Sequence, residues 1–512
     1  MSAGLACSAG TQTPPLPEAP PRTDNPPRAA LLPRLAAATA TLRDRLFDPV
    51  DPASLWVLRV VFGLLLFFAT VRFWQNGWIQ AHYIAPKFFF KYYGFEWVRP
   101  LSAAWMTACF AAMAVTSLFI AAGLFYRASA AVFFVLFSYA HFIDKTHYLN
   151  HYYFVSLFSF LLIFTPLNRV GSLDQRLGLV AHTARIPRWA LWLLRFQIGA
   201  VYFFAGLAKL TPDWLFHAQP LTIWLGANTD FPLVGPLFRY KATAFAMSWA
   251  GAGFDLSVPF LLSHRRTRPF AYAAVVVFHG LTGKLFPIGM FPWIMTSAAL
   301  VFFSADWPRR LLPAPFAERL FGPPPDASPQ RADAARADAS PERDAARPDS
   351  PARPSRSVQT AILAALALYA ALQIFVPLRA HLYSGPVCWT EQGFRFSWRV
   401  MLVEKNGDVQ LTATDPTTGK RWKIDPREHL YPYQIKQMST QPDMILEYAH
   451  FIADDFRRRG YPDIEVRARA YVAMNGRPPV LLIDPDVDLA RQTDGLTPYA
   501  FLLPAPSMAP EL

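Results

Sequence analysis

The stretch SLWVLRVVFGLLLFFATVRFW, residues 54–74, is apolar for nearly its whole length and contains only two charged side chains. At 1.5 Å per helical residue it reaches across about 30 Å, the thickness of the hydrocarbon core of a bilayer. Similar runs follow at 103–123, 127–143, 147–165, 190–210, 243–263, 269–286, 288–304 and 358–378. The sequence therefore predicts an α-helical multi-span membrane bundle of about nine transmembrane helices.

Composition supports this class. Of the 512 residues, 53% are hydrophobic and only 17% are charged, whereas soluble proteins have about 25% charged residues. The 47 prolines cannot all lie inside helices, so other kinds of segment must be present. The net charge of +13 comes largely from short loops that would all lie on one side of the membrane, as cytoplasmic loops do. We therefore expect no nucleic-acid partner.

The chain divides into five predicted regions. Residues 1–53, rich in Pro and Ala, are expected to be a disordered cytoplasmic tail, and residues 54–304 a transmembrane domain of about eight helices. Residues 305–357 have the Pro, Ala, Arg and Asp content of a disordered linker. Residues 358–378 are the last span, and residues 379–512 a small β-rich domain. With the amino terminus inside, nine spans place that domain outside the cytoplasm.

The predicted β-rich domain has several local signals. Alternation over 394–401 and over 464–474 predicts strands, and the pattern of 441–459 predicts a helix that ends at Gly460. Turns are predicted at Asn406-Gly407-Asp408, at Thr417-Thr418-Gly419-Lys420 and at Asn475-Gly476, after which the chain returns as a strand through 480–483.

Ionisable residues within apolar segments are candidate functional residues because burying them is costly. The densest group lies between the third and fourth predicted spans and consists of His141, Asp144, Lys145, His147, Asn150, His151, Tyr152 and Tyr153. On a helix, Asp144, His147 and His151 would share one face, and His141 and Lys145 another. Desolvation lowers the pKa of a lysine, so a buried Lys145 could act as a base.

Two alternatives remain for this group. Lys145 could extend to the outer interface or pair permanently with Asp144, which would make it structural. Asp144, His147 and His151 could instead supply three metal ligands, although no second cluster completes such a site, and we expect no metal. Elsewhere, Lys209 at the end of the fifth span suits an interface anchor, and Asp255 in mid-span requires a partner or a function.

The run Asp144-Lys145-Thr146-His147-Tyr148-Leu149-Asn150-His151-Tyr152-Tyr153 resembles the Asp-Lys-Thr…Asn-His…Tyr segment of vitamin K-dependent gamma-glutamyl carboxylases and their bacterial relatives, which share the HTTM domain. Further similar stretches occur in the same order. They are Gly123-Leu124-Phe125-Tyr126-Arg127, Leu194-Arg195-Phe196-Gln197-Ile198, Val201-Tyr202-Phe203, Asp255-Leu256-Ser257, Phe278-His279, Leu285-Phe286-Pro287-Ile288-Gly289-Met290-Phe291, Phe396-Ser397-Trp398 and Ile483-Asp484-Pro485-Asp486-Val487-Asp488.

The resemblance implies an enzyme that oxidises vitamin K hydroquinone to its epoxide with O2. The strong base formed on the way removes a γ-proton from a substrate glutamyl residue, which then captures CO2. In this family the lysine matching Lys145 deprotonates the hydroquinone. The resemblance further implies that His279 stabilises charge near the site and that Asn150 and His151 orient the lysine loop. Asp144 is also expected among the catalytic residues. Asp255, Phe286, Met290 and Tyr202 are the expected quinol-binding residues.

The same resemblance gives the expected setting: a multi-pass protein of the bacterial inner membrane, with a glutamyl-containing protein or peptide as its unidentified partner. The chain ends soon after Asp488, where vertebrate enzymes continue, so surfaces that recognise a substrate propeptide are expected to be incomplete. Two alternatives therefore stay open. One is a quinol epoxidase or oxygenase without protein carboxylation, and the other is a non-enzymatic scaffold that binds quinone or lipid.

Overall fold

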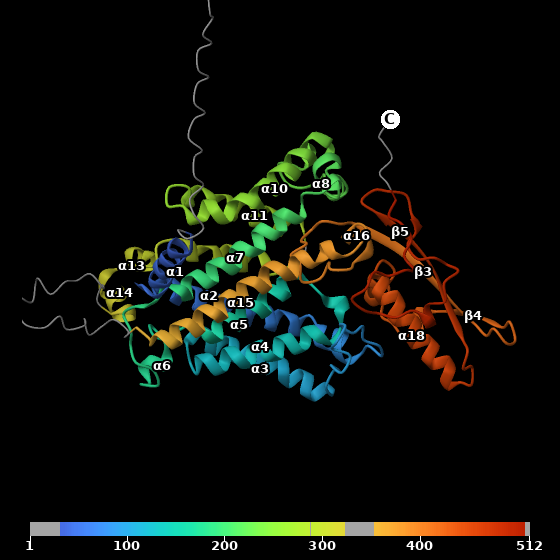
Figure 1. The fold of residues 1–512 in the computed structure, drawn as a ribbon, viewed down its shortest axis with the longest axis horizontal. Coiled ribbons are helices and arrows are strands. Elements are labelled where there is room, and N and C mark those ends of the chain that lie inside the picture. Colours follow the sequence, from blue (N-terminus) through green and yellow to red (C-terminus); the bar gives the residue numbers. More distant parts are fainter. Residues whose placement is uncertain (1–30, 287, 323–352, 507–512) are drawn as a thin grey trace, which may run out of the picture. The chain divides into compact units, whose positions relative to one another are not determined.

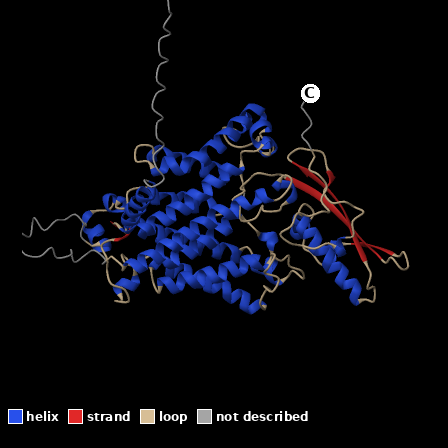
Figure 2. Ribbon diagram, in the orientation of Figure 1, coloured by secondary structure: helices blue, strands red, loops and turns tan. Residues whose placement is uncertain are grey.

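Helices make up most of the chain, with one small sheet near the carboxyl end (Figures 1 and 2). The structure is a computed structural model that describes residues 31–286, 288–322 and 353–506. It divides into two compact units, residues 1–46 and residues 47–512. The described residues of the first unit, 31–46, belong to helix α1 (Leu31–Phe47), and all elements named below belong to the second unit.

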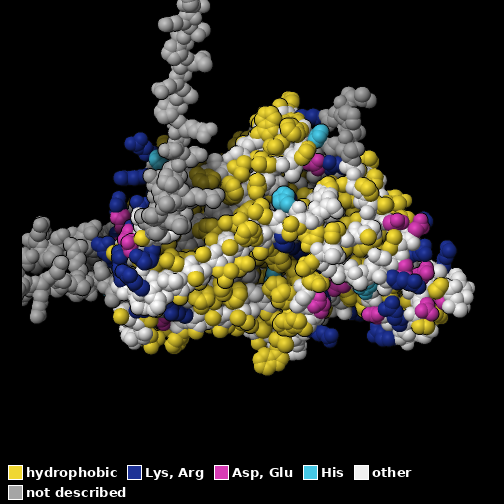
Figure 3. Space-filling model, in the orientation of Figure 1, with side chains coloured by type: hydrophobic (Ala, Val, Ile, Leu, Met, Phe, Trp, Pro, Cys, Tyr) yellow, Lys and Arg dark blue, Asp and Glu magenta, His cyan; other side chains and the backbone are white. Residues whose placement is uncertain are grey.

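Six helices among the described residues are long and apolar enough to cross a membrane. They are α2 (Ala53–Gln75), α3 (Ala103–Ala122), α4 (Tyr126–Ile143), α7 (Arg188–Ala208), α10 (Lys241–Ser263) and α15 (Arg356–Leu378), which continues as a 3-10 turn, η8, to Leu382. Large apolar side chains such as Phe68, Val135, Phe260 and Phe375 are exposed on them. Figure 3 shows the resulting apolar surface over the helices, with the charged side chains gathered toward their ends and on the carboxyl-terminal domain. Such a surface suits lipid contact.

The predicted count of nine spans is not confirmed. The other three predicted segments are helical but fall short in length or in apolar character: α5 (Asn150–Phe164) has 15 residues, and α12 (Phe291–Ala298) has 8 and continues as a 3-10 turn, η5, to Phe302. Helix α11 (Arg268–Leu285) has 18 residues, but Gly280, Thr282, Gly283 and Lys284 make its last turns polar. The sequence thus predicted correctly that these segments are helical, but it did not establish that they span the membrane.

Short elements connect the long helices. The two-residue strands β1 (Pro49–Val50) and β2 (Ile186–Pro187) pair antiparallel. The remaining connectors are the π-helical turn η2 (Gln80–Ile84), the 3-10 turns η3 (Lys145–His147) and η4 (Gly235–Arg239), and the short helices α6 (Leu173–Arg176), α8 (Pro212–His217), α9 (Leu221–Gly226), α13 (Trp307–Leu311) and α14 (Ala314–Phe321).

Parts of the predicted tail and linker are ordered helix. Residues 31–47 form α1, which is rich in the strong helix formers Ala, Leu and Arg. The first part of the predicted linker forms α13 and α14, where Phe321 and Ala317 are buried against Ala53 and Val170. These few apolar residues pack the start of the segment, although the average composition of residues 305–357 predicts a disordered linker. The rest of the predicted tail, 1–30, and of the linker, 323–352, lies outside the described residues.

The carboxyl-terminal domain contains a four-stranded antiparallel sheet in the order β4-β3-β5-β6. Its strands are β3 (Lys405–Thr414), β4 (Arg421–Ile424), β5 (Glu465–Met474) and β6 (Val480–Leu481). Its helical elements are α16 (Val387–Thr390), η9 (Pro426–Glu428), α17 (Pro432–Met438), α18 (Pro442–Arg458) and η10 (Leu489–Arg491). Helix α18 packs its apolar side chains on one face of the sheet, against Leu411, Val466, Ala468 and Ala470.

The structure confirms part of the local reading of this domain and corrects the rest. Helix α18 followed by Gly460, the strand β5 and the turns at 417–420 and at Asn475-Gly476 match the prediction. The predicted hairpin turn at 406–408 is wrong, because these residues lie inside β3 and pair with β5. The predicted strand over 394–401 is also wrong, since Phe396, Trp398 and Met401 have positive φ angles, which break an extended strand.

Candidate functional site

The Lys145 segment is a tight loop between α4 and α5 and not a continuation of either helix. Asp144 is extended, and Lys145 begins the 3-10 turn η3. Oδ1 of Asp144 accepts hydrogen bonds from the backbone N–H of Thr146 at 2.9 Å and from its hydroxyl at 2.7 Å, which closes the turn. The predicted helical faces for Asp144, Lys145 and their neighbours are therefore wrong.

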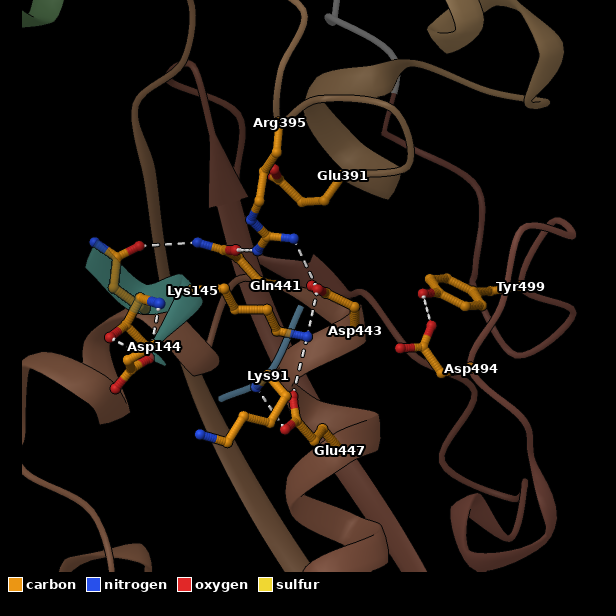
Figure 4. A network of polar contacts seen from close by, with 12 residues as sticks. Lys91, Asp144, Lys145, Glu391, Arg395, Gln441, Asp443, Glu447, Asp494 and Tyr499 are labelled. Atoms are coloured by element: carbon orange, nitrogen blue, oxygen red, sulfur yellow. Dashed lines mark hydrogen bonds and ion pairs between the residues drawn. The ribbon is translucent and has the colours of Figure 1, made fainter. Parts of the chain in front are cut away.

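Lys145 is buried, with 3% of its surface exposed, and it neither extends to an interface nor pairs with Asp144. Its Nζ lies 2.8 Å from Oδ2 of Asp443 and 3.0 Å from Oε2 of Glu447. Both carboxylates project from one face of α18 at i, i+4 spacing. Figure 4 shows the ammonium between them. The carboxyl-terminal domain thus supplies the direct partners of the candidate base.

Asp144 and Asn150 make other contacts between the loop and this domain. Oδ2 of Asp144 accepts a hydrogen bond from the side chain of Gln434 at 2.9 Å. The side-chain amide of Asn150 donates to the backbone oxygen of Arg399 at 2.9 Å, and its oxygen accepts from the hydroxyl of Tyr148 at 3.1 Å. Asp144 and Asn150 therefore hold the loop against the domain.

Arg395 completes the charge balance around Lys145. Its guanidinium donates to Oδ2 of Asp443 at 2.8 Å and also to the side-chain oxygen of Gln441. The cluster thus combines two cations, Lys145 and Arg395, with two carboxylates, Asp443 and Glu447. Sequence reasoning missed Arg395, Asp443 and Glu447, because nothing in the sequence relates α18 or residue 395 to a loop so far away in the chain.

These contacts decide the protonation states. Burial by itself would lower the pKa of Lys145, but the carboxylates of Asp443 and Glu447 outweigh burial and raise it. Burial opposes ionisation of Asp443 as well, yet Arg395 and Lys145 hold the pKa of that carboxyl well below its usual range. Burial raises the pKa of Glu447 despite the nearby ammonium. Lys145 is therefore protonated at neutral pH, and Glu447 is the more basic of its two partners.

A cavity of about 260 Å³ adjoins this cluster. Three cationic residues, Lys145, Arg379 and Arg395, line it together with three acids, Glu391, Asp443 and Asp494. Tyr499 also lines it and donates a hydrogen bond to Asp494 at 2.5 Å, as Figure 4 shows. This small, highly charged cavity is suited to a polar group and not to a lipid.

A second and larger cavity, of about 570 Å³, lies among α7, α10, α11 and α12. Of the predicted site residues it is lined by Asn150, His151, Tyr202, Asp255, His279 and Phe286. Most of its other lining is apolar, including Phe254, Phe278 and Phe291. Lys145 is absent from this lining. Lys145 and six of the other predicted residues thus line two different cavities, joined in sequence by residues 145–151.

Two polar pairs occur in the large cavity. The hydroxyl of Tyr202 and Nε2 of His279 are 2.7 Å apart, and Nδ1 of His279 is buried with no hydrogen-bond partner among the described residues. Nζ of Lys209 lies 2.8 Å from Oδ2 of Asp255, and Lys209 also faces the ring of Trp214. Lys209 is buried, so the interpretation as an interface anchor is wrong, and it is the partner that Asp255 requires.

Met290 and the remaining histidines lie elsewhere. Met290 lines a third cavity of about 90 Å³, which His141, His147 and His151 also line. His82 packs edge to face on His147, with ring centroids 4.3 Å apart. Burial lowers the pKa of His147 to about 4, so this imidazole is neutral at physiological pH. No group of three His, Cys, Asp or Glu residues in the described part of the chain could hold a metal ion.

The comparisons with known proteins divide the chain as the two structural regions do. Residues 47–307 match the model of the HTTM domain, and residues 358–508 match that of the vitamin K-dependent gamma-carboxylase lumenal domain. No solved structure matches the chain significantly. With its six apolar helices, it is a membrane protein with an extracytoplasmic domain. Because the HTTM match alone covers just over half of the sequence, the chain belongs to the vitamin K-dependent gamma-carboxylase family.

Proposed function

We propose that this protein oxidises a vitamin K-type hydroquinone to its epoxide with O2 and uses the base so generated to carboxylate glutamyl residues with CO2. Family membership supports the reaction class. The observation that carries the proposal for this chain is the buried loop of residues 145–151, which places Lys145 beside the charged cavity and Asn150 and His151 on the large apolar one.

The large cavity fits a prenylated quinol. Its volume of about 570 Å³ is in the range of small-molecule sites, which are mostly apolar with a few polar groups. Tyr202 and His279 are placed to hydrogen-bond a ring oxygen, because Nδ1 of His279 is buried and otherwise unpartnered in the described structure. Phe286 and Asp255 contribute to the wall. The bound quinol would supply the electrons that reduce O2.

In this proposal Lys145 acts as the base and Glu447 first takes the proton of its ammonium. Because Lys145 lines the charged cavity and not the large one, the proposal requires the quinol hydroxyl to reach it past residues 149–151. A protonated lysine cannot accept a proton, so its ammonium must first lose one. Glu447 lies 3.0 Å from Nζ, and burial raises the pKa of its carboxyl, which makes it the better acceptor of the two partners. Asp443, also paired with Arg395, stays ionised and keeps Lys145 in place.

Water exclusion also favours this assignment. Lys145, Asp144 and His279 are all buried. A strong base and a carbanion are both quenched by water, so chemistry of this kind requires an enclosed site. Lipid-facing helices around the large cavity would at the same time admit a lipophilic quinol from the bilayer.

The test uses purified protein in lipid nanodiscs, with reduced vitamin K, O2, labelled CO2 and a glutamyl peptide. The wild type should form epoxide and incorporate label. Lys145→Ala should lose both, and Lys145→Arg, which retains the charge but cannot act as a base, should lose them too. Equal epoxide formation by wild type and Lys145→Ala would contradict the assignment of the base. Epoxide without label on any peptide would instead indicate a quinol epoxidase.

The proposed orientation puts the amino-terminal end of α2 in the cytoplasm and the Lys145 loop at the outer face. Arg309 pairs with Asp51, just before the start of α2. Arg169 and Arg176 belong to the segment around Gly171, whose backbone oxygen accepts a hydrogen bond from Trp56 in the first turn of α2. Cytoplasmic flanks are enriched in such residues. Impermeant thiol reagents should therefore label a cysteine placed at Asp486 on intact cells, but not one placed at Ser357. The opposite pattern would reverse the orientation.

A further inference from the structure

The four-stranded sheet of the carboxyl-terminal domain has one covered face and one open face. On the covered face, Leu411, Ala413, Val466 and Ala468 are buried beneath α18. The open face contains the alternate residues, whose side chains are exposed or half-buried. From β3 these include Asp408, Gln410, Thr412 and Thr414, from β4 Arg421 and Lys423, and from β5 Glu465, Arg467, Arg469 and Tyr471.

Pairing register brings four cations together on this open face. Thr412 of β3 lies opposite Lys423 on one side and Arg467 on the other. Thr414 lies opposite Arg421, and Gln410 lies opposite Arg469. Uncharged β3 side chains thus separate two cationic rows. We call these four residues, Arg421, Lys423, Arg467 and Arg469, the basic face.

The spacing makes the basic face a concentrated positive field. Strands lie about 4.8 Å apart, so the two rows are about 10 Å apart, and neighbours within a row are separated by about 7 Å. These distances are comparable with the Debye length of about 8 Å at physiological salt. Like charges at such spacing repel each other, and an anionic partner would relieve that repulsion.

Two acidic side chains on the open face, Asp408 and Glu465, offset only part of the charge of these four cations. Glu465 pairs with Arg467 at 3.1 Å, and no ion pair of Arg421, Lys423 or Arg469 occurs among the described residues. The arginines at the end of α18 differ, because Arg457 pairs with Asp454, and Arg458 and Arg459 with Asp455. The basic face is therefore distinct from an ordinary charged surface with balanced signs.

The basic face is turned away from the membrane-spanning helices. Asp443 and Glu447 of α18 contact the Lys145 loop, so α18 lies between that loop and the sheet. At the β5–β6 turn, Arg477 contacts Asp213 of α8, whereas Arg467 lies toward the other end of β5, about 20 Å along the strand. Figure 1 shows β4 and the adjoining ends of β3 and β5 distant from α7 and α15. This placement favours a soluble partner over lipid headgroups.

We propose that the basic face docks an acidic, glutamate-rich segment of the peptide substrate, outside the site where the reacting glutamyl residue binds. The inference rests on the proposed function, which makes unmodified glutamyl peptides the substrate class. An extended acidic segment above β3 would turn every second side chain toward the sheet and place those carboxylates between the two cationic rows. The docked segment raises the local concentration of the neighbouring glutamyl residues at the catalytic site.

The test measures binding by the full-length protein in zwitterionic nanodiscs, without quinol or CO2, so that it does not depend on turnover. The probe is a fluorescent twelve-residue peptide of alternating Glu and Ser, and a Gln-for-Glu peptide is the comparison. The Glu peptide should bind in a salt-dependent way and the Gln peptide should not. The triple variant Lys423→Gln, Arg467→Gln, Arg469→Gln should bind the Glu peptide at least about 10-fold more weakly.

The matched control is Arg457→Gln, Arg458→Gln, Arg459→Gln, which removes the same charge from acid-paired arginines of the same domain. It should bind the Glu peptide like wild type. Equal binding of the Glu peptide by the face variant and wild type would overturn the proposal. It would also be overturned if the face variant bound the peptide normally but no longer bound phosphatidylserine vesicles, because the basic face would then recognise lipid headgroups. If wild type and both variants show no turnover but the peptide-binding results are as expected, the proposed function is wrong while the docking surface is still supported.

Discussion

The ammonium of Lys145 lies 2.8 Å from Oδ2 of Asp443, so a carboxylate of the carboxyl-terminal domain is the counter-ion of a lysine in the membrane-domain loop. The same oxygen accepts from Arg395. The role proposed for Lys145 is that of a base, yet here it is held in its charged form. Its contact with α18 therefore makes the outer domain part of the candidate catalytic apparatus and not only a platform for substrate.

Replacing Asp443 with Asn should lower the pKa of Lys145, because burial remains while the strongest attraction for the ammonium is lost. If Lys145 must be neutral to react, the acidic limb of the pH–rate profile for quinol oxidation moves to lower pH. Rates of quinol oxidation measured across neutral and alkaline pH check this. An unmoved limb would mean that Asp443 does not control the protonation of Lys145.

Asp494→Asn is the control for that shift, because Asp494 lines the same cavity but bonds to Tyr499 and not to Lys145. Its profile should match that of the wild type. In the wild type the ion pair is intact at neutral pH. The raised pKa of Lys145 keeps its ammonium charged to above pH 10.5, and the lowered pKa of Asp443 keeps its carboxylate charged to below pH 3.8. Stability from Asp443 is lost as pH falls through its lowered pKa, and that from Lys145 as pH rises through its raised one.

Local sequence patterns predicted the elements whose causes are local. Apolar runs identified α2, α3, α4, α7, α10 and α15, and alternation identified β5 with its turn. The strand predicted over 394–401 is absent because the alternating residues Phe396 and Trp398 have positive φ angles. Trp398 is fully buried there and stacks on Tyr153 of the membrane domain. Periodicity cannot distinguish such a loop from a strand.

The candidate site was predictable only in part for the same reason. The residues of the Lys145 segment stood out because ionisable groups are rare in apolar sequence. The partners Asp443 and Glu447 have an ordinary i, i+4 spacing on an amphipathic helix, where acidic side chains are normally solvated. Their function depends on how the carboxyl-terminal domain packs on the loop, which is a tertiary property.

His279→Ala should weaken quinol binding more than it affects the fold, because His279 lines the large cavity and bonds Tyr202. A hydrogen bond of this kind contributes about 1 kcal/mol, so Tyr202→Phe should raise KM for the quinol by roughly fivefold, and His279→Ala by at least as much. Steady-state rates of quinol oxidation over a range of quinol concentrations give KM for each variant. Tyr272→Phe, on the same helix but outside the cavity lining, should leave KM unchanged.

Lys209→Met should destabilise the bundle by about 3–5 kcal/mol, since removing one partner leaves the carboxylate of Asp255 buried and uncompensated. The double variant Lys209→Met, Asp255→Leu should recover much of that loss. Unfolding in detergent monitored by tryptophan fluorescence gives the free-energy differences. Breaking the exposed Arg310–Asp306 pair with Arg310→Gln should cost less than about 1 kcal/mol. A double variant as unstable as the single one would show that the two residues have separate functions.

Arg477 and Asp213 fasten the β5–β6 turn to helix α8 through two hydrogen bonds, from Nη2 to Oδ1 at 2.5 Å and from Nη1 to Oδ2 at 2.8 Å, and Asn475 donates a third to the same carboxylate. Arg477→Lys retains the charge but loses this paired geometry. Hydrogen exchange should therefore speed up in α8 and in the β5–β6 turn, while the buried core of α18 exchanges as before. Unchanged exchange in α8 would mean that other contacts, such as that of Trp224 with Glu404, suffice to hold the two regions together.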